Sequence, residues 1–280
     1  MVRIITDSAA DLQPREYDTL GVTCIPLHVA FGDAEYQENV DLSKEKFYEL
    51  LLGSENFPKT AQPSPAVLEE LLADAREKGD EVVYITLSSA LSGTYQTACM
   101  IRDDVEHPGN HVFDGKNATG GQRMLVEYAA KLRDEGKSAR EIIDGVESLN
   151  GRIVLYACMD TLEYLYRGGR ISQTVYKLGT LAQVKPIIRV SDEGKVEVPA
   201  KAMGMKKGMD YLCKRVEERK PDLNFPFYTM YTGDRSNGEK LAEKFRSMGY
   251  EIPQERIINV GAAIGSHVGP NACGMVYISE

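Results

Sequence analysis

The residues best suited to chemistry lie close together between Thr86 and Thr94. Three serines and two threonines are crowded there around one glycine, Gly93. A serine–glycine turn between a strand and a helix leaves backbone N–H groups free at the positive end of the helix dipole. Together with the hydroxyl groups, they suit an anion such as phosphate or carboxylate. The alternative, that Ser89 or Ser92 simply caps the helix, has about equal support.

Two polar segments precede this stretch. Asp7 and Ser8 follow a predicted strand, at the carboxyl end where open α/β sheets place their ligands. A capping turn is the equally supported alternative for this pair. Thr60 lies among prolines that restrict the backbone, so its hydroxyl can be held in one place. Ser64, followed by Pro65, is instead typical of a helix cap, which makes Thr60 the better ligand candidate.

Two later segments place a cationic or titratable side chain beside glycines. Arg167 and Arg170 flank a glycine pair after a predicted helix. Two interpretations are equally supported: the arginines cap the C-terminus of the helix, or they contact an anion or a partner. His267 follows Ser266 in the stretch 261–274, which contains four glycines. We interpret this stretch as a glycine-rich loop. A histidine in such a loop is a better candidate for a site than a lone histidine usually is.

The elements that must position these residues alternate in the first half of the chain. Strands and helices that follow one another in this way predict a parallel sheet wrapped on both faces. The predicted strands are 2–6, 22–31, 81–87 and 111–114. The predicted helices are 14–20, 44–52, 65–78, 93–100, 120–135 and 139–149.

The second half has a different pattern. A tight hairpin at Asp192-Glu193-Gly194 joins two strands, which a purely parallel sheet would not contain. Predicted strands are 153–156, 184–190, 195–203, 226–231, 256–260 and 274–278, with helices over 161–166, 206–218 and 238–248. Asn150-Gly151 is a turn signal. We therefore predict an α/β protein of two domains. Residues 1–150 form a Rossmann-like parallel-sheet domain, and residues 151–280 form an α+β domain with a mixed or antiparallel sheet.

Composition argues against several functional classes. A net charge of −9, with acids and bases well mixed, does not suit a nucleic-acid or acidic-membrane surface. The five cysteines form no C-x-x-C pair, so we interpret them as buried reduced thiols, and no cluster indicates a metal. The N-terminus reaches Asp7 too soon for a signal peptide, and no apolar run approaches membrane-spanning length. We expect a soluble cytoplasmic protein without a cofactor.

Taken together, these residues resemble the DegV family, also known as the fatty-acid-binding (FakB-type) subunits of bacterial fatty acid kinase. The similarity covers nearly the whole chain. Each segment is weak alone, but their order and spacing are specific. The segments are Thr6-Asp7-Ser8, Thr60 with Gln62-Pro63-Ser64, Ser88-Ser89 with Leu91-Ser92-Gly93-Thr94-Tyr95, Thr161-Leu162-Glu163-Tyr164-Leu165, Gly168-Gly169-Arg170-Ile171, Lys185-Pro186-Ile187 and Gly265-Ser266-His267-Val268-Gly269-Pro270.

The resemblance implies a long-chain fatty acid bound between the two domains, with its acyl chain in an apolar tunnel. Its carboxylate would meet groups matching Thr60, Ser92, Gly93 and His267. A carboxylate taken out of water needs several such donors. A separate ATP-dependent kinase would phosphorylate the bound carboxylate, so this protein would be a carrier without catalysis of its own. The chain departs from the family at Met203-Gly204-Met205, where arginines are usual on a basic surface that the resemblance assigns to kinase docking.

The main alternative is a serine hydrolase acting on a lipid or an acyl ester, with Ser92 as nucleophile and His267 as base. Against it, the sequence has no G-x-S-x-G elbow, and no acidic partner lies near His267 in the chain. A nucleotide-binding function has less support still. The chain contains neither G-x-x-x-x-G-K-[ST] nor a G-x-G-x-x-G that follows a strand.

Overall fold

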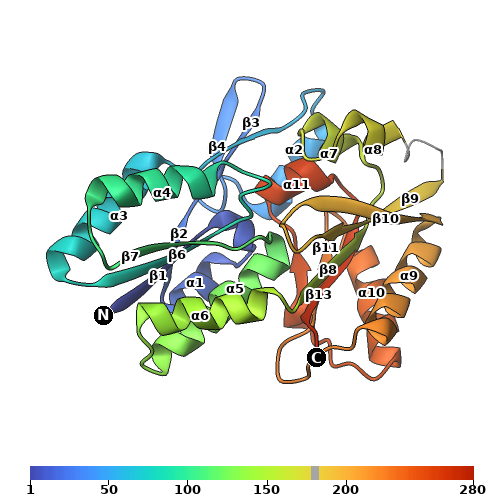
Figure 1. Cartoon of the computed structure of the whole chain (residues 1–280). Helices are drawn as coiled ribbons and strands as arrows, with labels where there is room; N and C mark the ends of the chain where they lie inside the picture. Colours follow the sequence, from blue (N-terminus) through green and yellow to red (C-terminus); the bar gives the residue numbers. More distant parts are fainter. Residues whose placement is uncertain (178–182) are drawn as a thin grey trace.

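The computed structural model describes residues 1–177 and 183–280, which form three sheets (Figure 1). The first sheet is parallel and has the strand order β2-β1-β6-β7. Neighbouring residues of each strand face opposite sides, so Ile4 belongs to one core and Ile5 to the other. The strands are β1 Val2–Asp7, β2 Val22–Ile25, β6 Glu81–Thr86 and β7 Asn110–Asp114.

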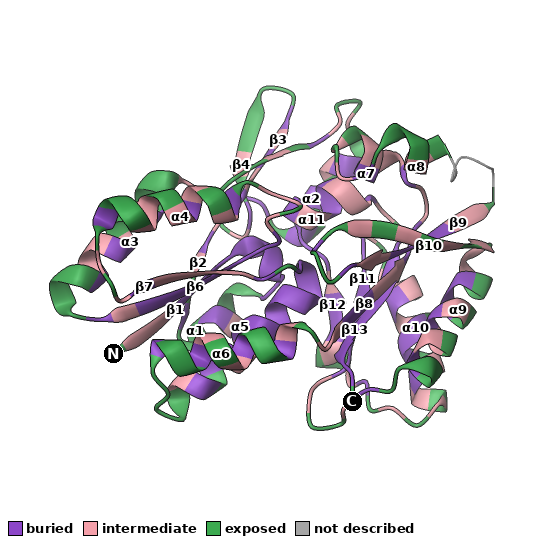
Figure 2. Ribbon diagram, viewed as in Figure 1, coloured by how far each residue is buried: buried purple, intermediate pink, exposed green. Residues whose placement is uncertain are grey.

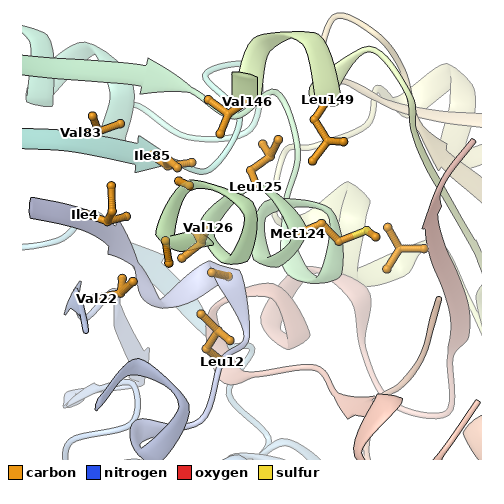
Figure 3. Close-up of a cluster of buried hydrophobic side chains, with 14 of the residues drawn as sticks. Ile4, Leu12, Val22, Val83, Ile85, Met124, Leu125, Val126, Val146 and Leu149 are labelled. Carbon is orange, nitrogen blue, oxygen red and sulfur yellow. The ribbon is translucent and has the colours of Figure 1, made fainter. Parts of the chain in front are cut away.

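Two helices cover each face of the parallel sheet. Helices α3 and α4 pack on the face that Ile5 and Tyr84 share, and α5 and α6 pack on the other. Figure 3 shows Leu125 of α5 and Val146 of α6 facing Ile85 of β6. The helices are α3 Pro65–Lys78, α4 Thr94–Val105, α5 Thr119–Asp134 and α6 Ala139–Asn150.

The second sheet is mixed and has six strands in the order β10-β9-β8-β13-β11-β12. Only β11 and β12 pair in parallel; the other neighbours are antiparallel. Helices α9 Met205–Glu218 and α10 Ser236–Ser247 cover one face. The strands are β8 Ile153–Cys158, β9 Val184–Val190, β10 Val196–Met203, β11 Tyr228–Tyr231, β12 Ile257–Asn259 and β13 Cys273–Ile278.

Helix α5 lies between the parallel and the mixed sheet and joins them into one core. A Cβ added at Gly120 would lie 2.5 Å from Val276 Cγ1, so glycine allows α5 to approach β13 closely. The strands on either side are mostly buried, whereas exposed residues gather on the outer helices (Figure 2). The predicted α/β fold, with a parallel sheet followed by a mixed sheet, is confirmed. The domain boundary between residues 150 and 151 stays a prediction.

The predicted strand over 22–31 is wrong in one respect, because it is two strands in different sheets. β2 ends at Ile25, and β3 His28–Phe31 joins a small antiparallel sheet of order β4-β3-β5. Pro26 stands between them, has no N–H to donate, and therefore interrupts the ladder. The other two strands of this sheet are β4 Ala34–Gln37 and β5 Lys59–Ala61.

The glycine-rich stretch 261–274 was also predicted incorrectly, because residues Ala262–Val268 form a helix, α11. Its small residues let it pack closely on α2 Lys44–Gly53. A Cβ at Gly265 would lie only 2.6 Å from Phe47 Cε1. Helix α11 also contacts α7 (Figure 1). The remaining helical segments are η1 Ser8–Ala10, α1 Pro14–Leu20, α7 Glu163–Arg167, α8 Gln173–Lys177 and η2 Gln254–Arg256.

Candidate functional site

A cavity of about 370 Å³ lies between the elements of the first and second halves of the chain. This volume is within the range of small-molecule sites. Most of its lining side chains are aliphatic. They come mainly from the mixed sheet, from α11 and from the loops that follow β2 and β6. They include Leu27, Leu87, Leu91, Leu155, Ala157, Leu165, Ile188, Val190, Val196, Met230, Val260, Ile264 and Val268. Such a lining suits a hydrocarbon chain.

Thr60, Ser92, Gly93, Arg170 and His267 all line this one cavity. Thr60 lies in β5 and His267 near the end of α11, and their Oγ1 and Nε2 atoms are 2.8 Å apart. Two residues separated by 207 positions in the sequence are thus joined directly. The structure therefore brings these five candidates together, whereas the other candidates from the sequence, Asp7, Ser8, Ser89 and Arg167, do not line the cavity. The role of the five in binding stays a prediction.

His267 is neutral at physiological pH. Burial, with a smaller contribution from the positive charge of Arg170, lowers the pKa of His267 to about 3. Its Nδ1 atom is buried and has no hydrogen-bond partner. A Cβ at Gly168 would lie 2.1 Å from that atom, so glycine is needed there for close approach. When Nε2 carries the ring proton and donates it to Thr60, the Thr60 hydroxyl proton is free for an acceptor in the cavity.

Arg170 supplies a positive charge to the cavity wall. Its Nε donates to the carbonyl of Leu91 at 3.0 Å, and its Nη1 donates to the carbonyl of Gly168. Within residues 1–177 and 183–280, no acidic side chain forms an ion pair with it. Burial lowers the pKa of Arg170, but an arginine remains charged at physiological pH. A half-buried cation without a counter-ion favours an anionic ligand.

Arg167 has a different environment from Arg170. It forms an ion pair with Glu163, one helical turn earlier, at 2.6 Å. Its guanidinium also lies over the Phe57 ring, 4.5 Å from the centroid. Arg167 is therefore engaged within the protein, whereas Arg170 faces the cavity.

The hydroxyls of the central stretch also divide into two groups. Ser88 donates to the carbonyl of Gly194 at 2.8 Å, and Ser89 donates to the carboxylate of Asp114. Both serines thus hold loops together. Ser92 lines the cavity, and its Oγ lies 2.9 Å from Thr94 Oγ1 and accepts the Thr94 N–H at 3.3 Å. Ser89 therefore does not cap α4, whereas Ser92 bonds the backbone at the start of that helix and also lines the cavity.

A family model for DegV proteins, a family described as uncharacterised, matches residues 1–280. The chain belongs to the DegV family. A DegV domain-containing protein from Caldanaerobacter subterraneus is 34% identical over 278 residues, which are 99% of this chain and 98% of that protein.

Two solved DegV structures are similar along their whole length. A fatty-acid-binding DegV family protein from Thermus thermophilus has a TM-score of 0.87 and 30% identity, covering 100% of this chain and 99% of that one. DegV of Bacillus subtilis, a fatty acid binding protein, has a TM-score of 0.84 and 26% identity, with the same coverage.

The Asp7-Ser8 pair of this DegV chain lies outside the cavity lining. Asp7 accepts hydrogen bonds from the N–H groups of Leu87 and Ala9 and from the Gln122 side chain. Burial raises the pKa of Asp7 to about 6. The capping alternative is the one that the structure supports, because both carboxylate oxygens are used within the protein.

Sequence reasoning missed Gln62 as part of the site. Gln62 lines the cavity and accepts a hydrogen bond from Thr97 Oγ1 at 2.7 Å. A Cβ at Gly93 would lie 2.4 Å from Gln62 Nε2, so the glycine makes room for this amide. Its position could have indicated this, because Gln62 lies two residues after Thr60 and side chains two apart in an extended segment face the same side.

Other kinds of site find little support in the described part of the chain. Residues 1–177 and 183–280 contain no group of three or more His, Cys, Asp or Glu side chains that could hold a metal. None of their helices combines the length and apolarity needed to cross a bilayer.

Proposed function

We propose that this DegV protein binds a long-chain fatty acid, with its acyl chain in the apolar cavity. Its carboxylate would lie near Thr60, Ser92, Gly93 and His267, with Arg170 as a further anion contact. The observation that carries the proposal is a mostly aliphatic cavity whose wall also holds Arg170, a cation that has no counter-ion among the described residues. Fatty acid binding by the Thermus and Bacillus proteins, both at least 25% identical over the whole chain, supports it.

The physical chemistry of a fatty acid matches this arrangement. A carboxylate that leaves water needs charged or neutral donors to replace its hydration. Burying the alkyl tail contributes about 0.8 kcal/mol per methylene. A long chain therefore binds tightly even after the costs of ordering it are subtracted.

The hydroxyls of Thr60 and Ser92 give a direct test of where the carboxylate lies. Thr60→Ala and Ser92→Ala should each weaken oleate binding by about 10- to 150-fold. Each removes a hydrogen bond to a charged group, worth about 1.5–3 kcal/mol. The measurement is a fluorescence or calorimetric titration on delipidated protein.

Ser89→Ala is the matched control, because Ser89 belongs to the same turn but donates to Asp114. Its oleate affinity should stay within about twofold of the wild type, because a substitution away from the ligand changes the binding free energy by less than about 0.5 kcal/mol. Unchanged affinity in both Thr60→Ala and Ser92→Ala would place the carboxylate elsewhere.

We further propose that the protein is a carrier without catalysis of its own. A nucleophilic serine needs a base within hydrogen-bond reach and a third group to orient that base. Within the described residues Ser92 is bonded to Thr94 and His267 to Thr60, and His267 Nδ1 has no carboxylate partner. This geometry does not support the alternative of a serine hydrolase.

The finer part of the proposal is that a separate ATP-dependent kinase phosphorylates the bound carboxylate. Its support is the family resemblance in sequence. Lys206 and Lys207, at the start of α9, are exposed, as is Met203 at the end of β10. These residues would lie on the docking surface, with two methionines in place of the usual arginines.

A further inference from the structure

Two buried carboxylates accept hydrogen bonds from the backbone at the start of α11, the short helix that carries His267. Asp11 Oδ1 accepts the N–H of Gly261 at 2.7 Å, and Glu38 Oε1 accepts the N–H of Ala263 at 3.1 Å. Both acids come from the first half of the chain, more than 200 residues away in sequence. They use N–H groups that a helix leaves unpaired in its first turn.

Two donors hold the backbone just before the helix. Lys44 Nζ donates to the carbonyl of Asn259 at 2.8 Å, and Tyr48 Oη donates to the carbonyl of Val260 at 2.9 Å. Lys44 Nζ also lies 3.9 Å from Asp11 Oδ1, so a cation partly balances the acids. The three consecutive residues before the helix, 259–261, are thus held by side chains, two of which donate hydrogen bonds and one of which accepts.

The fit between these acids and the helix is close. A Cβ at Gly261 would lie 2.2 Å from Glu38 Oε1 and 2.6 Å from Asp11 Oδ1, so any larger residue would displace them. Each of the two acids is only 1% exposed. Burial, together with the nearby charge of Asp11, raises the pKa of Glu38 to about 7. Burying two carboxylates side by side is costly unless they are well bonded.

Helix α11 depends on such outside support. Seven residues are too few for a helix to be stable by itself. Because it is short, its two ends move together, and a shift at Gly261 carries His267 away from Thr60. We therefore expect the 2.8 Å contact between His267 and Thr60 to depend on the carboxylates at the other end of the helix.

We propose that Asp11 and Glu38 are positioning residues of the fatty acid site, which hold the start of α11 so that His267 meets Thr60. The proposal rests on the function proposed above. Neither acid lines the cavity, so both act through the helix and not by contact with the ligand.

The test compares Glu38→Gln and Asp11→Asn with Glu127→Gln. Glu127 is a largely buried carboxylate bonded to Arg123 and Tyr228, and none of its hydrogen bonds among the described residues is to α11. Glu38→Gln should weaken oleate binding by about tenfold or more, and Glu127→Gln by less than about twofold, even when both lower Tm. Asp11→Asn provides the same test if the first variant does not fold.

A double-mutant cycle separates positioning from general destabilisation. In a His267→Ala background, the effect of Glu38→Gln on oleate affinity should fall to less than about twofold, because the side chain through which it acts is gone. An undiminished loss in that background would overturn the proposal.

The ligand-free protein gives a second readout. The ¹⁵N signals of the His267 ring should shift in Glu38→Gln and Asp11→Asn, as the hydrogen bond to Thr60 weakens, and stay unchanged in Glu127→Gln. Unaltered ring signals in both of the first two variants would contradict the positioning role. Because this measurement needs no fatty acid, it separates failure of this proposal from failure of the proposed function.

Discussion

Arg170→Met should lower the affinity for oleate about 100-fold and leave the affinity for oleyl alcohol almost unchanged. The arginine is half-buried and without an acidic partner among the described residues, so a bound carboxylate supplies its missing counter-ion. Truncating one member of a desolvated charge pair costs about 2–5 kcal/mol, much of it from the charge left behind. An alcohol is uncharged, so its binding to Arg170→Met leaves no buried charge without a partner. The measurement is a pair of titrations with the acid and the alcohol of equal chain length.

Arg167→Met is the control for this change. Arg167 lies three residues earlier, pairs with Glu163 and covers the Phe57 ring. Its loss should alter the affinity for oleate by less than about twofold, since exposed ion pairs contribute little. Equal losses for acid and alcohol in Arg170→Met would show that the arginine shapes the cavity and does not bind the carboxylate.

The second large effect is expected from filling the cavity. Ala157 in β8 lines it, so Ala157→Phe should weaken palmitate binding more than 100-fold and octanoate binding much less. If the ring displaces about four methylenes at about 0.8 kcal/mol each, the loss is about 3 kcal/mol. A series of saturated acids titrated by calorimetry measures this dependence on length.

Ala34→Phe, at an exposed position in β4, controls for the added ring. It should leave all of these affinities unchanged. If Ala157→Phe reduced the binding of every chain length equally, or of none, the tail would lie outside this cavity.

The parallel sheet was predictable because its strands are apolar runs separated by helices with recognisable end signals, such as Pro65 and Gly79 at the two ends of α3. The mixed sheet was predictable from the hairpin at residues 192–194, which forces two strands to run antiparallel. In both cases the signal is local, since side-chain periodicity and turn residues act within one element. The break at Pro26 was visible in the sequence, but the second sheet that β3 joins is formed by residues distant in the chain.

Helix α11 could not be predicted in the same way. Gly265 within it, and Gly261 and Gly269 at its two ends, favour a loop by intrinsic propensity, and tertiary contacts override that preference. Gly265 approaches Phe47, and Gly261 approaches Glu38, only once the chain has folded. The cavity is likewise a property of packing between distant elements. Sequence resemblance could indicate Thr60, Ser92 and His267, but not that Thr60 and His267 bond to each other.

The most direct test of the central claim is to identify what the purified protein carries. Protein produced in a bacterial host should, after organic extraction and mass spectrometry, release about one long-chain fatty acid per chain. Adding oleate to the delipidated protein should raise its Tm, because a ligand that binds only the folded state stabilises it. An extract without fatty acid, together with a Tm that oleate does not change, would contradict the account.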